Sequence, residues 1–187
     1  MMTNKKQSPG WSVIRQHLNT QARPALLALV NDLDEASAST CDVLHARVQD
    51  EAGDETAVER YRRTIIEQCY PSRGFGTLTR AEARHAIREY RRATGNLAGT
   101  MDLMLTDGEH DMQVTRECGE INAADDHRLE SVLHELTQLL RKDDPVLYPQ
   151  FRERIQQLDA HADHIGWGDG DALRAHIGVL DTELAGE

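Results

Sequence analysis

The sequence predicts an all-α protein: a single domain of about eight or nine helices packed as antiparallel pairs, in a short α-solenoid or a multi-helix bundle. Apolar residues recur at three- and four-residue spacing over most of the 187 residues. Alternating apolar and polar runs, which would indicate strands, are almost absent. Aromatic residues make up only 4% of the chain, so the core must be aliphatic, which suits thin helical layers. We place the domain over residues 1–187, with 1–8 as a flexible tail.

Start signals and apolar spacing predict the first four helices. The helices begin, in order, at Ser8-Pro9, at Pro24, at Ser39 or Thr40, and at Asp54. Their inward positions are Trp11, Ile14 and Leu18; Leu26, Leu27, Val30 and Leu33; Val43, Leu44 and Val48; and Val58, Tyr61, Ile65 and Ile66.

The fifth helix has one of the clearest starts, because Thr79 and Glu82 form a capping box, and Gly95 is a plausible residue just past its end. Four more helices follow, and the first of them can continue past Gly108 as far as Val114. Their apolar positions are Leu97, Met101, Leu103, Met104 and Leu105; Leu129, Val132, Leu133, Leu136, Leu139 and Leu140; Phe151, Ile155 and Leu158; and Leu173, Ile177 and Leu180.

Charge and cysteine content limit the class of protein. A net charge of −11 argues against general binding to nucleic acid or a membrane surface. The three cysteines, Cys41, Cys69 and Cys118, have no CxxC spacing and none stands beside a histidine, which favours reduced thiols. No apolar segment follows the basic N-terminus, and no run approaches the ~20 apolar residues of a membrane span. We therefore expect a cytoplasmic protein without a cofactor.

The most distinctive stretch is 60–92, which holds nine arginines and three glutamates, a net charge of +6 in an acidic chain. On a helical wheel the fifth helix places its arginines on one face and its apolar residues on the opposite face. Four of these arginines, Arg80, Arg84, Arg88 and Arg91, have no acid three or four residues away. Because like charges at this spacing repel, something outside the helix must compensate them.

Two sources of compensation are open. A neighbouring helix can supply carboxylates for bidentate arginine pairs. The candidates are Asp102, Asp107, Glu109, Asp111, Glu117, Glu120, Asp125 and Asp126. An acidic or phosphorylated partner can instead dock on the arginines, assisted by the helix N-terminus. In the fourth helix Glu59 already neutralises Arg62 and Arg63.

The loop before the fifth helix adds glycines to this basic segment. It is neither a Walker A motif nor a GxGxxG, and a tight turn with Phe75 in the core explains it as well. The candidate anion- or partner-binding residues are Arg73, Gly74, Gly76, Arg80, Arg84, Arg88 and Arg91.

Three other clusters contain histidine. His161 and His164, with Asp169 and Asp171, form an alternative divalent-metal site, but no matching second half is visible. The clusters 109–111 (Glu-His-Asp) and 125–127 (Asp-Asp-His) lack a nucleophile, and we expect them to be surface charge. No catalytic residue is predicted.

Several short segments, taken in order, resemble one family. They are Leu18 to Leu33, Tyr70-Pro71-Ser72-Arg73-Gly74 into Ala81 to Tyr90, Asp102-Leu103-Met104-Leu105, Thr115 through Gly119-Glu120-Ile121, and Ile165-Gly166-Trp167-Gly168. The family they resemble is a group of small bacterial all-helical proteins catalogued as domain of unknown function 6155. The resemblance implies one compact helical domain with no known cofactor or assigned reaction. Cys118 and Asp169-Gly170-Asp171 depart from its pattern.

Taken together, these features predict a non-enzymatic helical interaction or scaffold protein that binds an acidic or phosphorylated protein partner through its arginine face. The alternatives are a metal-assisted hydrolase using the histidine and aspartate cluster, and an acidic regulator that mimics nucleic acid. The oligomeric state is left open.

Overall fold

The computed structural model describes residues 10–69, 80–118, 126–142 and 145–162, together with Gly178 and Thr182. For some residues beside the gaps, such as Arg80, the side chain lies outside the description. The predicted all-α class is confirmed, since no strand occurs among these residues. The helices are α1 (Trp11–Leu18), α2 (Arg23–Ala36), α3 (Ala38–Glu51), α4 (Thr56–Cys69), α5 (Arg80–Thr94), α6 (Leu97–Cys118), α7 (Asp126–Lys142), the 3-10 turn η1 (Pro145–Leu147) and α8 (Tyr148–Ala162).

The chain separates into two compact units, Met1–His45 and Ala46–Glu187. The smaller unit contains α1, α2 and the start of α3, and the larger unit contains the other helices. The single domain over 1–187 stays a prediction. The expected tail over 1–8 and the expected ninth helix lie outside the described residues.

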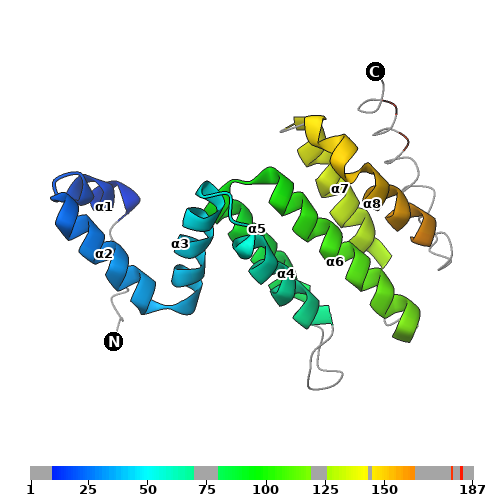
Figure 1. The fold of residues 1–187 in the computed structure, drawn as a ribbon, viewed down its shortest axis with the longest axis horizontal. Coiled ribbons are helices and arrows are strands. Elements are labelled where there is room, and N and C mark those ends of the chain that lie inside the picture. The colour runs from blue at the N-terminus through cyan, green and yellow to red at the C-terminus, as the bar shows by residue number, and fades with distance from the viewer. Residues whose placement is uncertain are drawn as a thin grey trace, which may run out of the picture. The chain divides into compact units, whose positions relative to one another are not determined.

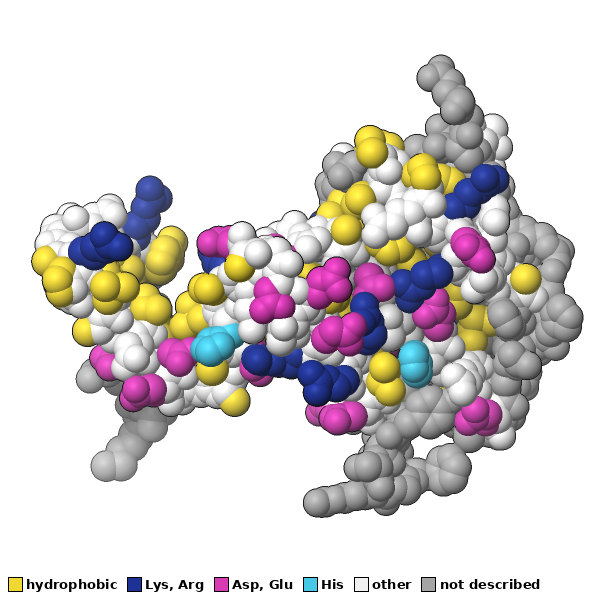
Figure 2. Space-filling view, in the orientation of Figure 1, with side chains coloured by type: hydrophobic (Ala, Val, Ile, Leu, Met, Phe, Trp, Pro, Cys, Tyr) yellow, Lys and Arg dark blue, Asp and Glu magenta, His cyan; other side chains and the backbone are white. Residues whose placement is uncertain are grey.

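The smaller unit has no buried residue among residues 10–45. Its large apolar side chains are exposed instead, and Figure 2 shows them gathered over α1 and α2. They are Trp11, Val13, Ile14, Leu27, Leu29, Val30 and Leu33. The inward positions predicted for α1 and α2 are therefore wrong at Trp11, Ile14, Leu27, Val30 and Leu33. An apolar helix face is buried only where a second element covers it, and this unit has too few helices to enclose a core.

In the larger unit α6 is the central helix. It contacts α4 and α5 on one side and α7 and α8 on the other (Figure 1). Between Thr100 and Gly108 every residue except Asp102 is buried. A helix surrounded in this way cannot be amphipathic, so its periodicity is weak. The helix continues through Gly108 without a break, so the prediction that it can extend past this glycine as far as Val114 is confirmed.

The helices around α6 bury the apolar faces that their spacing predicts. These residues are Tyr61 and Ile65 of α4; Ala83, Ala86, Ile87, Tyr90 and Ala93 of α5; Val132, Leu133, Leu136, Leu139 and Leu140 of α7; and Phe151, Ile155 and Leu158 of α8. Gly95 has the positive φ of +70° expected just past the end of α5. No described helix combines the length and the apolar character needed to span a bilayer.

Two predicted helix starts need correction. The first helix begins at Trp11 after Gly10, later than Ser8-Pro9. The third is capped by Ser37, whose Oγ accepts a hydrogen bond from the Thr40 N–H, so neither Ser39 nor Thr40 is the cap. Val48, predicted to face inward from this helix, is 67% exposed.

At Gly99, α6 is in close contact with the side chain of Tyr90 from α5. A Cβ at this position would lie 2.2 Å from the hydroxyl oxygen of Tyr90 and 2.8 Å from its Cζ. Tyr90 is buried and its ring packs edge-on against Tyr61, with ring centroids 5.4 Å apart. The ring therefore cannot simply swing away, and only glycine fits at position 99.

We predict that Gly99→Ala lowers the free energy of unfolding by about 1–3 kcal/mol, the usual cost of overpacking. Without the contact, the same change in a helix would be stabilising by about 0.5–1 kcal/mol. Chemical denaturation measures the difference. In a Tyr90→Phe background the loss should shrink, because the closest atom is removed. A stabilised Gly99→Ala protein would show that the ring is not held against α6.

Candidate functional site

The predicted arginine face lies on α5, opposite the buried side of that helix. Arg84, Arg88 and Arg91 are all exposed. Arg80 begins the helix, but its side chain is outside the described residues, as are Arg73, Gly74 and Gly76. Of the seven candidate residues, the structure thus brings three together on one surface.

Two of the carboxylates expected to neutralise this face, Asp102 and Glu109, pair with arginines of other helices. Within the described part of the chain, no ion pair or hydrogen bond reaches Arg84 or Arg88. On α6, Asp102 pairs with Arg62 of α4 and with Arg154 of α8. Among the described residues, Asp102 therefore pairs with arginines of α4 and α8 and not with those of α5. Glu59 also pairs with Arg62, as expected.

Arg154 joins α8 to two acids of α6. Its Nη1 donates to Asp102 Oδ1 at 2.6 Å, while its Nε and Nη2 donate to the two oxygens of Glu109 at 2.7 and 2.8 Å. The second pair is the bidentate geometry that makes arginine–carboxylate contacts strong. The hydrogen bond with Glu109 is the main cause that raises the pKa of Arg154. For Arg62, burial lowers the pKa, but contacts with Asp102 and Glu59 outweigh it and the pKa is raised.

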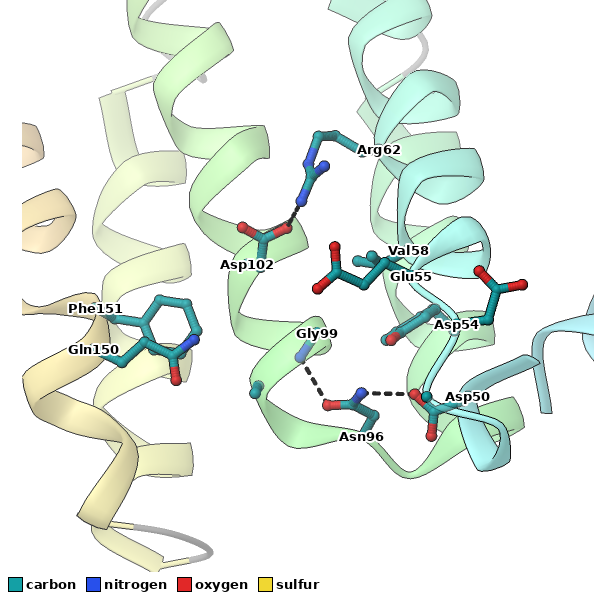
Figure 3. Close-up of a pocket in the computed structure, with 13 residues that line it drawn as sticks. Asp50, Asp54, Glu55, Val58, Arg62, Asn96, Gly99, Asp102, Gln150 and Phe151 are labelled. Carbon is teal, nitrogen blue, oxygen red and sulfur yellow. Dashed lines mark hydrogen bonds and ion pairs between the residues drawn. The ribbon is translucent and has the colours of Figure 1, made fainter. Parts of the chain in front are cut away.

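Beside Asp102 lies a pocket of about 380 Å³, within the usual size range of small-molecule sites. It opens between α4, α6 and α8, with the turn from α3 to α4 forming one end (Figure 3). Its polar lining is dominated by acids. The lining residues are Asp50, Gly53, Asp54, Glu55, Val58, Arg62, Tyr90, Asn96, Ala98, Gly99, Asp102, Gln150 and Phe151.

Local hydrogen bonds position the acidic end of this pocket. Asn96 caps α6 by accepting the Gly99 N–H at 2.9 Å, and its amide donates to Asp50 Oδ1 at 2.6 Å. Asp54 caps the start of α4 by accepting from the N–H and hydroxyl of Thr56, which lowers the pKa of Asp54. The cap explains Asp54 without a ligand.

Glu55 has no such role among the described residues, where no hydrogen bond or ion pair is recorded for its carboxylate. It is exposed, and Figure 3 shows it reaching from the start of α4 toward Asp102. On the opposite side Gln150 and Phe151 enter from α8. Since Asp102 is paired with two arginines, the other lining carboxylates, Asp50, Asp54 and Glu55, carry the charge available to a ligand.

The potential in the pocket is reflected in Tyr90. Its burial, together with the charge of Asp50 and a hydrogen bond with Asp50, raises its pKa to about 12. The negative charge of Asp50, which disfavours a phenolate at Tyr90, favours a cation nearby. At neutral pH Tyr90 is therefore an uncharged hydrogen-bond donor beside a carboxylate.

Sequence reasoning did not find this pocket, because its lining comes from segments about 100 residues apart in the chain. It also placed the 109–111 cluster on the surface, whereas Asp111 is only 5% exposed. The reason is that α6 is covered on both sides. The sequence signal for the cap of α6 is Asn96, which directly follows Gly95 at the end of α5. This cap also positions Asp50.

Metal binding was predicted near the C-terminus. His164, Asp169 and Asp171 lie outside the described residues, as does the side chain of His161 in the last turn of α8. Among the described residues, three metal-ligand side chains come within reach of one ion only at Asp34, Cys41 and His45. The carboxylates of the pocket do not form such a group.

Comparison with protein families, curated proteins and solved structures finds no match to this chain. The resemblance to domain of unknown function 6155 therefore stays a prediction.

We predict that the protein loses stability in alkali because of Tyr90. Its folded pKa of about 12 lies above the unfolded value of about 10. The neutral phenol is thus favoured by folding, and its contribution is full below pH ~10 and lost as the pH rises through ~12. Denaturation at a series of alkaline pH values should show a shallower decline for Tyr90→Phe. Equal slopes would mean that burial and the charge of Asp50 do not raise the pKa of Tyr90.

Proposed function

We propose that this protein is a non-enzymatic binding protein whose acidic pocket holds a small organic cation, an alkyl ammonium or alkyl guanidinium group. The observation that carries the proposal is Glu55, a carboxylate in the wall of a pocket that Asp50 and Asp54 also line, with no recorded partner among the described residues. A ligand cation between them would complete their charge balance.

The remaining lining suits the rest of such a ligand. Tyr90 offers a neutral hydroxyl at the acidic end, and Val58 and Phe151 supply apolar surface for an alkyl chain. The aromatic rings can also attract a cation through their π faces. Arg62 and Arg154 offset the charge of Asp102, so negative charge is concentrated at the end of the pocket that holds Asp50, Asp54 and Glu55.

The first experiment is a calorimetric titration of the full chain with hexylamine and hexylguanidine, using hexanol and hexanoate as neutral and anionic controls. We expect only the cations to bind, with Kd on the order of 1 mM or below, about −4 kcal/mol or better. Glu55→Gln should weaken binding about tenfold, a loss of about 1.4 kcal/mol. Glu51→Gln, an exposed glutamate outside the pocket, should change nothing. Equal binding of hexanoate, or an unchanged Glu55→Gln protein, would contradict the proposal.

A second candidate function rests on the arginine face. Arg84 and Arg88 are exposed, and no partner for either is recorded among the described residues. In a protein of net charge −11, these arginines form a local basic surface suited to an acidic or phosphorylated protein partner.

For this surface we predict that Arg84→Glu/Arg88→Glu leaves the free energy of unfolding within about 0.5 kcal/mol, as for other surface changes. The variant should also lose salt-sensitive binding to a polyglutamate peptide, measured by fluorescence anisotropy. Arg15→Glu/Arg23→Glu makes the same charge change on α1 and α2 and serves as the control. A fall of several degrees in Tm at low salt would instead mean that the arginines are paired within the chain.

A further inference from the structure

A second cluster of chemically active side chains lies in the smaller unit. Asp34 is in the last turns of α2, and Cys41 and His45 are on α3. One ligand atom from each of the three lies within 4.8 Å of the others. This set combines a thiol, an imidazole and a carboxylate, which are the three side-chain types that bind zinc.

The backbone holds the three side chains in place. Cys41 and His45 are four residues apart, which puts them on the same side of α3. Only Ser37 separates α2 from α3, and its extended backbone (φ −160°, ψ 146°) redirects the chain between them. The Ser37 cap on Thr40 then sets the start of α3. The cluster is thus formed by two helices and a one-residue connection rather than by long loops.

The spacing agrees with one tetrahedral ion. His45 Nε2 lies 3.5 Å from Asp34 Oδ1. Nitrogen and oxygen ligands at 2.0–2.1 Å from a tetrahedral zinc are roughly 3.4 Å apart. We propose that Asp34, Cys41 and His45 form a Zn²⁺ site with three protein ligands.

The cluster is accessible to solvent. The side chains of Asp34 and His45 are 34% and 50% exposed, so a water molecule or a ligand from another molecule can complete the tetrahedron. Zinc requires the thiolate form of cysteine and a neutral imidazole nitrogen, so binding releases the thiol proton of Cys41 to solvent.

The ion would also stabilise the part of the chain that has no core. Residues 10–45 contain no buried side chain, and short helices without buried contacts are marginally stable in water. A metal bound between α2 and α3 supplies the cross-link that small units otherwise obtain from disulfides or a core. Zinc should thus protect the backbone amides of these two helices from hydrogen exchange.

The test uses the untagged full chain, stripped with a chelator and titrated with Zn²⁺ and, separately, Co²⁺. We expect one equivalent of metal per protein chain by equilibrium dialysis. The cobalt form should show a thiolate-to-cobalt charge-transfer absorption. Cys41→Ser should remove that absorption, and Asp34→Asn and His45→Gln should each weaken zinc binding at least tenfold. Asp32→Asn and His17→Gln, which alter an aspartate and a histidine of the same unit outside the cluster, are the controls.

Hydrogen exchange provides an independent readout, with zinc slowing exchange in α2 and α3 of the parent protein and not in Cys41→Ser. Absence of stoichiometric binding would overturn the proposal. So would zinc binding that survives the triple change Asp34→Asn/Cys41→Ser/His45→Gln, since the metal would then occupy another site. A cobalt complex without the thiolate band would equally exclude Cys41 as a ligand.

Discussion

The larger unit depends on one carboxylate on its central helix. Asp102 is the least buried residue in the middle of α6, and it accepts from Arg62 on one side and Arg154 on the other. Because these arginines belong to α4 and α8, the three side chains connect α4, α6 and α8. The apolar core brings these helices together but does not by itself fix their register. The bidentate contact between Arg154 and Glu109 repeats the link two turns along α6. Hydrogen-bonded charge pairs of this kind are directional, whereas aliphatic packing is not.

The same arrangement explains the pocket. Because Arg62 and Arg154 pair with Asp102, α4, α6 and α8 can line one cavity without an unpaired carboxylate at its centre. The remaining acidic charge of the pocket lies at the end where α4 begins, at Asp50, Asp54 and Glu55. Tyr90 and Gly99 close the floor, because α5 and α6 approach so closely that only glycine is accommodated. The smaller unit has no buried residue over 10–45. The zinc ion proposed at Asp34, Cys41 and His45 would cross-link its helices α2 and α3 instead.

The sequence predicted those features that depend on local periodicity. The buried face of α5 and the glycine at its end follow from helical spacing and backbone preference, and both are present. The exposed leucines of α2 have the same periodicity, yet burial also requires a covering neighbour, which spacing cannot reveal. Asp102 was recognised as a possible partner for arginine, but for the wrong helix. Its partners lie 40 and 52 residues away, and the choice between them depends on which helices pack against α6.

Asp102 couples α4 to α8 through α6. A thermodynamic cycle measures this coupling: Asp102→Asn is compared in the parent protein and in the Arg62→Met/Arg154→Met background by chemical denaturation. We expect Asp102→Asn to cost about 1–3 kcal/mol in the parent and far less when both arginines are absent. Costs that agree within about 0.5 kcal/mol in the two backgrounds would contradict it, because additivity means that the residues do not interact.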